Sequence, residues 1–392
     1  MEKVDFEHRT RLVFGSGEIA RLGAVARELG GSRALVVSDS GVVAAGHFGR
    51  GVESLEAAGV QVAAFHGVKE NPSTAEVDAG LQVARQFRPD LLIGLGGGSS
   101  LDCAKGINFL YSCGGRMEDY WGVGKATADM LPMIAVPTTA GTGSEAQSFA
   151  LISQADTHTK MACGDRRAAC RVALLDPELT VTQPPRVTAL TGIDAISHAL
   201  ESYVTRRRNP LSNCYSRTAW QLLSQGFPAV LADPSDVESR GQVQLGAFFA
   251  GLAIETSMLG AAHALANPLT AQFNVTHGQA VGLMLPHVVR FNAACSPEVS
   301  KWYAELWRDV PQSPSLTLAT QDDSPVDALA NYIQSLAARA GLHTALANCG
   351  VTASDVSKLA VDASKQWTGN FNPCPLQEGD FRRLYIEALG IP

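Results

Sequence analysis

Residues 91–105 read LLIGLGGGSSLDCAK, and this stretch decides the fold class. Its apolar run, 91–95, is bounded by Pro89 and Gly96, which is typical of a strand buried on both faces of a parallel sheet. The glycines that follow let the backbone turn sharply into a helix and come close to a phosphate. We therefore predict a phosphate-binding turn, although a tight strand–helix turn needs glycine too, and the pattern is not the usual GxGxxG.

Strands and helices alternate on both sides of this stretch. The helical segments are 10–15 residues long in the main, and such alternation predicts a parallel α/β sheet. The expected strands are 11–14, 34–37, 61–65, 91–95, 133–136 and 171–175, and the expected helices are 19–29, 52–58, 74–87 and 99–110.

The pattern changes after Asp176, where Pro177, Pro184 and Pro185 interrupt the chain. From Thr188 onward the long periodic runs are helical, with almost no strand-like alternation. A chain of 392 residues is also too long for one ordinary core. We expect two domains: an α/β domain over 1–185 and an all-α domain over 186–392.

Composition narrows the class of protein. The net charge of −7 and a pI near 5.7 argue against a nucleic acid as main partner. The apolar stretch 245–269 is interrupted by Glu255 and His263, so we expect a buried helix and not a membrane span. Eight scattered cysteines without a CxxC pair, and an N-terminus without an apolar leader, indicate reduced thiols and a cytoplasmic protein.

A carboxylate and three imidazoles form a candidate metal site in the second half. Asp194 and His198 are four residues apart, so a helix presents both from one face, and Thr191 is expected to cap that helix. His263 lies in an apolar helical pattern, and His277 near a helix end or loop. Such a set suits iron or zinc. The alternative is a capping Asp and hydrogen-bonded core histidines.

A second loop of the α/β half resembles the first in its position. Residues 137–145, PTTAGTGSE, also follow a strand and offer hydroxyls and amides. Two such loops at the carboxyl ends of parallel strands form a dinucleotide-binding crevice. Asp39 ends an earlier strand, where a carboxylate favours NAD over NADP by binding ribose hydroxyls. A turn-forming Asp is the alternative at that position.

Taken together, these motifs resemble the iron-containing (group III) alcohol dehydrogenase family. The resemblance spans nearly the whole chain. The segments that carry it are GGGSSLDCAKGI, PTTAGTGSEA, LLDPEL, TGIDAISHALESYV and HGQAVGLMLPHVVRFN. It implies an N-terminal NAD-binding α/β domain and an all-α C-terminal domain, the dehydroquinate synthase-like fold, with the metal in the cleft between. It also implies hydride transfer between NAD(H) and a primary or small polar alcohol or aldehyde, and a homodimer or larger oligomer.

The resemblance also assigns site residues. It implies Fe(II), with Zn as a substitute, on Asp194, His198, His263 and His277. The implied cofactor-binding residues are Asp39, Asn71, Gly97, Gly98, Ser99, Asp102, Thr138, Thr139, Thr142, Ser144 and Lys160.

One position departs from the family pattern. The family usually has a second His four residues after the first, and here that residue is Asn267. Asn cannot act as an acid or base near neutral pH but can hydrogen-bond a substrate oxygen. We expect Asn267 to orient substrate and His277 to share in proton transfer. Three alternatives remain: a metal-free maleylacetate-type reductase, a dehydroquinate-synthase-like lyase, and a non-catalytic nucleotide or metal sensor.

Overall fold

The structure is a computed structural model that describes residues 7–157, 159–311 and 324–390. The described chain divides between Gln183 and Pro184 into two units, each with its own packing. The assignment of 1–185 to cofactor binding and of 186–392 to metal and substrate binding concerns chemistry, and it stays a prediction.

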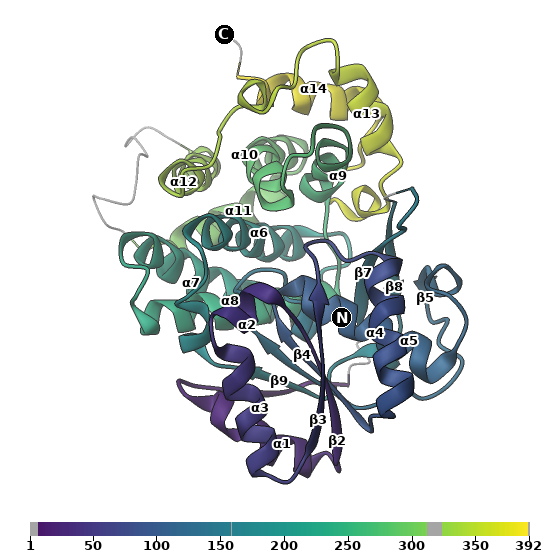
Figure 1. The fold of residues 1–392 in the computed structure, drawn as a ribbon. Coiled ribbons are helices and arrows are strands. Elements are labelled where there is room, and N and C mark those ends of the chain that lie inside the picture. The colour runs from purple at the N-terminus through teal and green to yellow at the C-terminus, as the bar shows by residue number, and fades with distance from the viewer. Residues whose placement is uncertain (1–6, 158, 312–323, 391–392) are drawn as a thin grey trace. The chain divides into compact units, whose positions relative to one another are not determined.

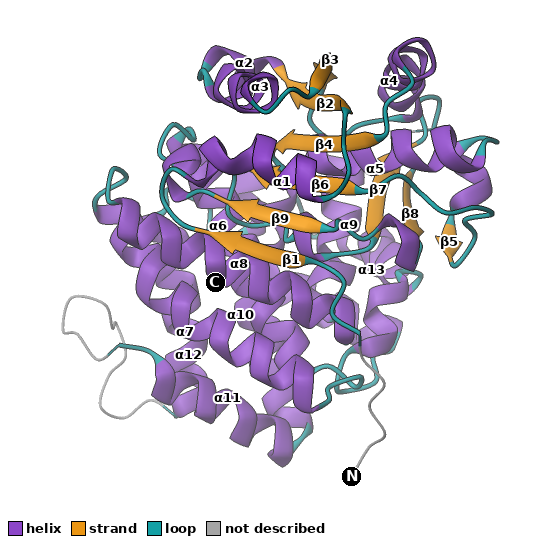
Figure 2. Ribbon diagram, turned by 90° about the horizontal axis from the view of Figure 1, so that it is seen from below, coloured by secondary structure: helices purple, strands orange, loops and turns teal. Residues whose placement is uncertain are grey.

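The first unit is built on a six-stranded parallel sheet, as predicted. From one edge to the other the strands are β1 (Arg11–Phe14), β9 (Val172–Leu175), β6 (Met133–Pro137), β4 (Leu91–Gly96), β2 (Arg33–Asp39) and β3 (Gln61–Val68). Figure 2 shows this order along the sheet. Central β4 pairs with β2 through Leu92↔Leu35 and with β6 through Leu92↔Met133. The glycine-rich stretch therefore leaves the middle of the sheet.

Helices cover both faces of this sheet (Figure 1). Alternate residues of β2 point to opposite sides: Val36 packs in the cluster of α1 (Leu22–Glu28) and α3 (His47–Ala57). Leu35 packs in the cluster of α4 (Thr74–Phe87) and α5 (Gly98–Cys113). Each fully buried Leu or Val side chain contributes about 1.5–3 kcal/mol. Burial on both faces explains why the central strands β4 and β6 are continuous apolar runs.

A second, three-stranded sheet was not predicted. It consists of β5 (Gly122–Val123), β8 (Lys160–Gly164) and β7 (Phe149–Ser153), with β7 and β8 antiparallel. Ile152 and Met161 are buried in the cluster that contains α5. This packing partner is distant in the sequence, so the local pattern of these short strands did not reveal them.

The second unit has no strand among its described residues. Its helices are α6 (Pro185–Val204), α7 (Pro210–Ala232), α8 (Val237–Thr256), α9 (Ala261–Phe273), α10 (His277–Cys295), α11 (Pro297–Asp309), α12 (Pro325–Arg339), α13 (Val356–Ser364) and α14 (Glu378–Ala388). The first unit also has the short α2 (Ser40–Ala44). Among the described residues the 3₁₀ turns are η1 (Glu18–Arg21), η2 (Met117–Tyr120), η3 (Ser144–Ala146), η4 (Arg166–Ala168), η5 (Pro177–Thr180), η6 (Leu346–Cys349) and η7 (Trp367–Phe371).

Two expectations about these helices are wrong. Thr191 does not cap α6, because Pro185 begins the helix six residues earlier at the position where proline is favoured. The Thr191 hydroxyl donates instead to the carbonyl of Val187 within the helix, at 2.9 Å. The apolar stretch 245–269 is not one helix, because α8 ends at Thr256 and α9 begins at Ala261.

No single helix of the described chain is long and apolar enough to cross a bilayer. Helices α8 and α9, bent by 103° relative to each other, reach that length and apolar composition only when they are counted together.

The cysteines differ from the expectation that all eight are reduced. Cys295, at the end of α10, and Cys374, after η7, form a disulfide with Cα atoms 6.3 Å apart. The other six are free thiols. Cys295 and Cys374 are 79 residues apart in the sequence, so only the tertiary fold brings them together. The expectation of eight reduced cysteines was wrong for this reason.

Candidate metal and cofactor sites

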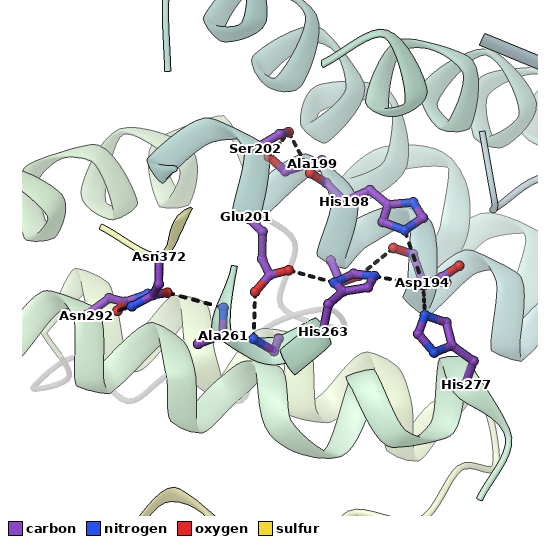
Figure 3. Close-up of polar contacts among 12 residues, drawn as sticks. Asp194, His198, Ala199, Glu201, Ser202, Ala261, His263, His277, Asn292 and Asn372 are labelled. Carbon is purple, nitrogen blue, oxygen red and sulfur yellow. Dashed lines mark hydrogen bonds and ion pairs between the residues drawn. The ribbon is translucent and has the colours of Figure 1, made fainter. Parts of the chain in front are cut away.

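Four polar side chains from three helices of the second unit face one another (Figure 3). Asp194 and His198 come from one face of α6, as their four-residue spacing predicts. His263 lies in the first turn of α9, and His277 is the first residue of α10. Asp194, His198 and His263 are buried, while the His277 side chain is 33% exposed. The structure therefore brings together all four predicted ligands.

The distances in this group suit a metal ion. Nε2 atoms of His198, His263 and His277 lie 3.4, 3.7 and 3.7 Å from one oxygen, Oδ1 of Asp194. Ligand atoms about 2.0–2.2 Å from a tetrahedral ion are about 3.3–3.6 Å apart.

The four residues are not equally close to one another. Ligand atoms of Asp194, His263 and His277 all lie within 4.8 Å of one another. His198 is outside that group of three, and its ring stacks on the ring of His263 with centroids 5.0 Å apart. Three of the four residues are thus placed to share an ion, and His198 adjoins them through Asp194.

Two buried atoms at the centre of this group have no hydrogen bond within the described chain. These atoms are Asp194 Oδ1 and His263 Nε2, and the 3.7 Å between them is too long for one. Leaving a polar atom buried and unsatisfied costs about 1–3 kcal/mol. A cation between these atoms would satisfy both of them, so the residues present fit a metal.

Electrostatic interactions among these side chains favour the ionised form of Asp194 and the protonated form of His263. Burial alone would raise the pKa of Asp194, but the three surrounding imidazoles hold that pKa well below its usual range. Burial alone would lower the pKa of His263, but the carboxylates of Glu201 and Asp194 outweigh it and raise the pKa to about 9. Without a metal, the site is therefore a strongly polar one in which His263 holds a proton.

Glu201 was not predicted as part of the site. Its Oε2 lies 2.6 Å from His263 Nδ1, and its Oε1 accepts the Ala262 N–H at 2.6 Å. Figure 3 shows this carboxylate beside His263, on the side away from Asp194. The sequence contained a signal for Glu201, because Asp194, His198 and Glu201 have the i, i+4, i+7 spacing of one helix face.

Most of the predicted cofactor residues of the first unit follow the carboxyl ends of β2, β4 and β6, whereas Asn71 follows β3 and Lys160 begins β8. From β2 the chain runs outward to β3 and then returns to β4 on the other side of β2. This reversal is a topological switch point, where α/β sheets bind ligands. Asp39 ends β2, and the glycine loop follows β4 beside it.

Asp39 caps a helix and also contacts the glycine loop. Its Oδ1 accepts the N–H groups of Gly41 and Val42, which fits the turn-forming alternative. Its Oδ2 accepts the Ser100 hydroxyl at 3.1 Å. The carboxylate is partly exposed. Both readings of Asp39 are therefore compatible with its position.

The two predicted loops pack directly against each other. A Cβ on Gly98 would lie 2.7 Å from Oγ1 of Thr142, and a Cβ on Gly97 would lie 3.3 Å from Thr139. The Thr138 N–H donates to the Gly96 carbonyl at 3.0 Å. Glycine at 98 is thus required by this close approach, and it leaves the start of α5 without a side chain.

Asn71, Ser99 and Lys160 lie together beside this loop. The Asn71 N–H donates to the Ser99 hydroxyl at 3.2 Å, and Lys160 Nζ donates to Asn71 Oδ1 at 3.4 Å. Asn71 has a φ of 53°, which Asn tolerates better than most residues. A lysine and an amide are thereby placed next to the glycine loop.

Asp102 and Ser144 have inward-facing hydrogen bonds. The Ser144 hydroxyl donates to Asp102 Oδ1, and the Leu151 N–H donates to Asp102 Oδ2. Fully buried Lys105 donates to the carbonyls of Ser144, Gln147 and Phe149 at 2.6–2.8 Å. Burial raises the pKa of Asp102. This network holds the second loop, and the predicted cofactor contacts of Asp102 and Ser144 stay predictions.

Asn267 lies one turn after His263 on α9, and its amide is engaged by a neighbour. Asn267 Nδ2 donates to Gln366 Oε1 at 2.9 Å. This hydrogen bond holds the Asn267 side chain, and its contact with the substrate stays a prediction.

Comparison with known proteins gives the family. The family described as iron-containing alcohol dehydrogenase matches residues 9–177, and the C-terminal region of the Fe-containing alcohol dehydrogenase family matches residues 188–389. The chain is 31% identical to the NAD-dependent methanol dehydrogenase of Bacillus methanolicus, over 96% of this chain and 97% of that protein. It is 32% identical to the 1,3-propanediol dehydrogenase of Klebsiella pneumoniae, over 96% of each.

Solved structures agree with both the fold and the family. A 1,3-propanediol oxidoreductase superposes with a TM-score of 0.91 at 30% identity, covering 99% of this chain and 100% of that one. The sulfoacetaldehyde reductase of Bifidobacterium kashiwanohense, solved with NAD+, superposes at 0.88 with 26% identity and complete coverage of both chains. The predicted fold class and the resemblance are confirmed. The chain belongs to the iron-containing alcohol dehydrogenase family.

Proposed function

We propose that this protein is a metal-dependent dehydrogenase that transfers a hydride between NAD(H) and a primary or small polar alcohol or aldehyde. The observation that carries the proposal is the approach of three imidazole Nε2 atoms to one buried carboxylate oxygen, at 3.4–3.7 Å. The names of the relatives, methanol and 1,3-propanediol dehydrogenases, support a small alcohol as substrate.

Asp194, His198, His263 and His277 would hold the metal, with Fe(II) the ion implied by the family and Zn(II) a substitute. A bound cation of this kind acts as a Lewis acid that polarises the C–O bond of the substrate. Each histidine must offer a neutral Nε2 to serve as a ligand. The unsatisfied Nε2 of His263 and Oδ1 of Asp194 support this assignment.

For the cofactor we propose NAD, bound at the carboxyl ends of β2, β4 and β6. Asp39 would accept hydrogen bonds from the adenosine ribose, and the N–H groups at the start of α5 would bind the pyrophosphate. Lys160 and Asn71 would add a positive charge and an amide beside them. The remaining proposed contacts come from Gly97, Gly98, Ser99, Asp102, Thr138, Thr139, Thr142 and Ser144.

We assign proton transfer to His277 and orientation of the substrate to Asn267. The His277 side chain is 33% exposed and begins α10, so water reaches it. Asn267 would hydrogen-bond the substrate and could not carry the proton itself. Its bond to Gln366 would keep the amide in one orientation for that purpose.

We further propose a cytoplasmic protein that acts as a homodimer or larger oligomer. Six of its eight cysteines are free thiols, which suits a reducing compartment, and there the Cys295–Cys374 disulfide would be open. Family resemblance supports the oligomer. The net charge of −7 supports a small-molecule substrate and speaks against nucleic acid.

The test is metal content of protein purified without oxygen, together with NADH-dependent reduction of short aldehydes before and after chelation. We expect activity to vanish on chelation and to return with Fe(II). The Asp194→Ala variant should lose metal and activity together. The control is Asp327→Ala, which removes a half-exposed carboxylate on α12 that pairs with Arg290 on α10 at 3.2 Å.

Other outcomes would favour the alternatives. Activity that survives chelation would replace the proposal with a metal-free maleylacetate-type reductase. Metal and NAD binding without any hydride transfer would point to a lyase of the dehydroquinate-synthase type or to a sensor.

A further inference from the structure

We propose that Glu201 is a positioning residue that fixes the tautomer of His263, so that Nε2 carries the lone pair needed by a metal. The inference rests on the proposed function. Glu201 does not touch the ligand face of the site, and it would act through His263. In metal sites, a carboxylate on the second ring nitrogen commonly orients a histidine in this way.

The contacts of Glu201 leave little freedom. The residue is buried, and each of its oxygens has one short contact: Oε1 with the Ala262 N–H and Oε2 with His263 Nδ1, both at 2.6 Å. An ionised carboxylate can only accept, so His263 Nδ1 must carry a proton and donate. The neutral form of the ring then has its lone pair on Nε2, which faces Asp194 at 3.7 Å.

The start of α9 is held in place around this carboxylate. The Ala261 N–H donates to Asn372 Oδ1 at 3.4 Å, and Asn372 exchanges amide hydrogen bonds with buried Asn292 at 2.7 and 3.1 Å. A Cβ on Gly260 would lie 3.0 Å from Glu201 Oε1 and 3.2 Å from Asn372 Oδ1. The helix end therefore packs tightly against Glu201, and His263 is locked relative to it.

A Glu201→Gln substitution tests the tautomer directly. The backbone N–H of Ala262 can only donate, so it claims the carbonyl oxygen of the new amide. The NH₂ group then faces His263 Nδ1 and stabilises the tautomer with the proton on Nε2. That tautomer cannot bind a metal through Nε2. Volume and shape are nearly unchanged, so the fold should persist.

The measurement is the dissociation constant for Zn(II) and Co(II), obtained by competition with a chelator. We expect Glu201→Gln to bind each ion about 10–100-fold more weakly than the wild type. Glu201→Asp, which keeps both acceptor oxygens, should recover part of this loss. The control is Glu305→Gln, which removes a partly buried carboxylate that accepts the Tyr203 hydroxyl at 2.6 Å.

A second measurement needs no variant. Imidazole ¹⁵N spectra of zinc-loaded wild-type protein should show His263 with a proton on Nδ1 and with Nε2 bound to zinc. Zinc on Nδ1, or a proton on Nε2, would overturn the inference even if Glu201→Gln failed to fold.

The outcomes separate this inference from the function on which it rests. Affinity of Glu201→Gln within twofold of wild type would refute the role of Glu201 and leave the metal-dependent dehydrogenase intact. Wild-type protein that binds neither ion would overturn both. Neither the affinity measurement nor the ¹⁵N spectrum requires the natural substrate.

Discussion

Metal binding at this site should displace a proton from His263. We therefore expect the metal affinity to depend on pH. The neighbouring carboxylates raise the pKa of His263 to about 9 in the metal-free protein. At pH 7 the ring is then about 99% protonated, since the pKa lies about two units higher. A metal must remove the proton from Nε2, which lowers its apparent affinity at pH 7 by about 100-fold, or about 2.7 kcal/mol.

The assay is Zn(II) affinity by chelator competition from pH 6.5 to 9.5. We expect affinity to rise about tenfold per pH unit up to about pH 9 from this group alone. Calorimetry in two buffers of different ionisation enthalpy should show proton release near pH 7. His287 is an internal control, because burial lowers its pKa to about 4 and it stays neutral throughout. Affinity independent of pH between 7 and 9 would refute the reasoning.

The same shift predicts how the metal-free protein responds to pH. A group whose pKa is raised from 6.5 to about 9 on folding stabilises the folded state fully below pH 6.5. That contribution, up to about 3 kcal/mol, is lost as pH rises through about 9. Denaturant unfolding of chelated wild type should show this loss, and His263→Asn should not.

Two substitutions in the first unit test the loops that follow β4 and β6, one through stability and one through NADH binding. Lys105→Met should lower the free energy of unfolding by about 3–5 kcal/mol, measured with denaturant, because it strips three carbonyls and buried Asp102 of their cation. Gly98→Ala should weaken NADH binding about tenfold in a fluorescence titration, because the new Cβ would lie 2.7 Å from Thr142 and cost about 1–3 kcal/mol in strain. Gly49→Ala, where the Cβ meets nothing within 4 Å, should bind NADH normally.

Elements with a complete local signal were predictable from sequence. Helix α4 runs over the predicted residues 74–87, because Ser73 and Glu76 form a capping box and Arg88 ends the helix in the left-handed region. Strand β4 was predictable because burial on both faces leaves a plain apolar run. Where the signal depends on contacts with distant residues, as in the three-stranded sheet or the disulfide, the sequence did not reveal it.

The metal site likewise has a part that local sequence spacing predicts and a part that depends on contacts between distant residues. Asp194 and His198 could be paired from their spacing alone, because one helix face holds both. The approach of His263 and His277 to them depends on how α6, α9 and α10 pack. Their residue types made a shared site a hypothesis, and the family resemblance then assigned all four as ligands. Glu201 was missed because its importance lies in reaching His263 on another helix.

The disulfide between Cys295 and Cys374 closes a covalent ring across the C-terminal part of the chain. Closing a loop of 79 residues removes conformations from the unfolded ensemble, and this restriction stabilises the folded state by about 4.5 kcal/mol. Thioredoxin and glutathione would open the ring in a reducing cytoplasm and return that entropy to the unfolded chain. The same polypeptide would then have two stabilities, one for each redox environment, while the metal ligands on α6, α9 and α10 stay chemically unchanged.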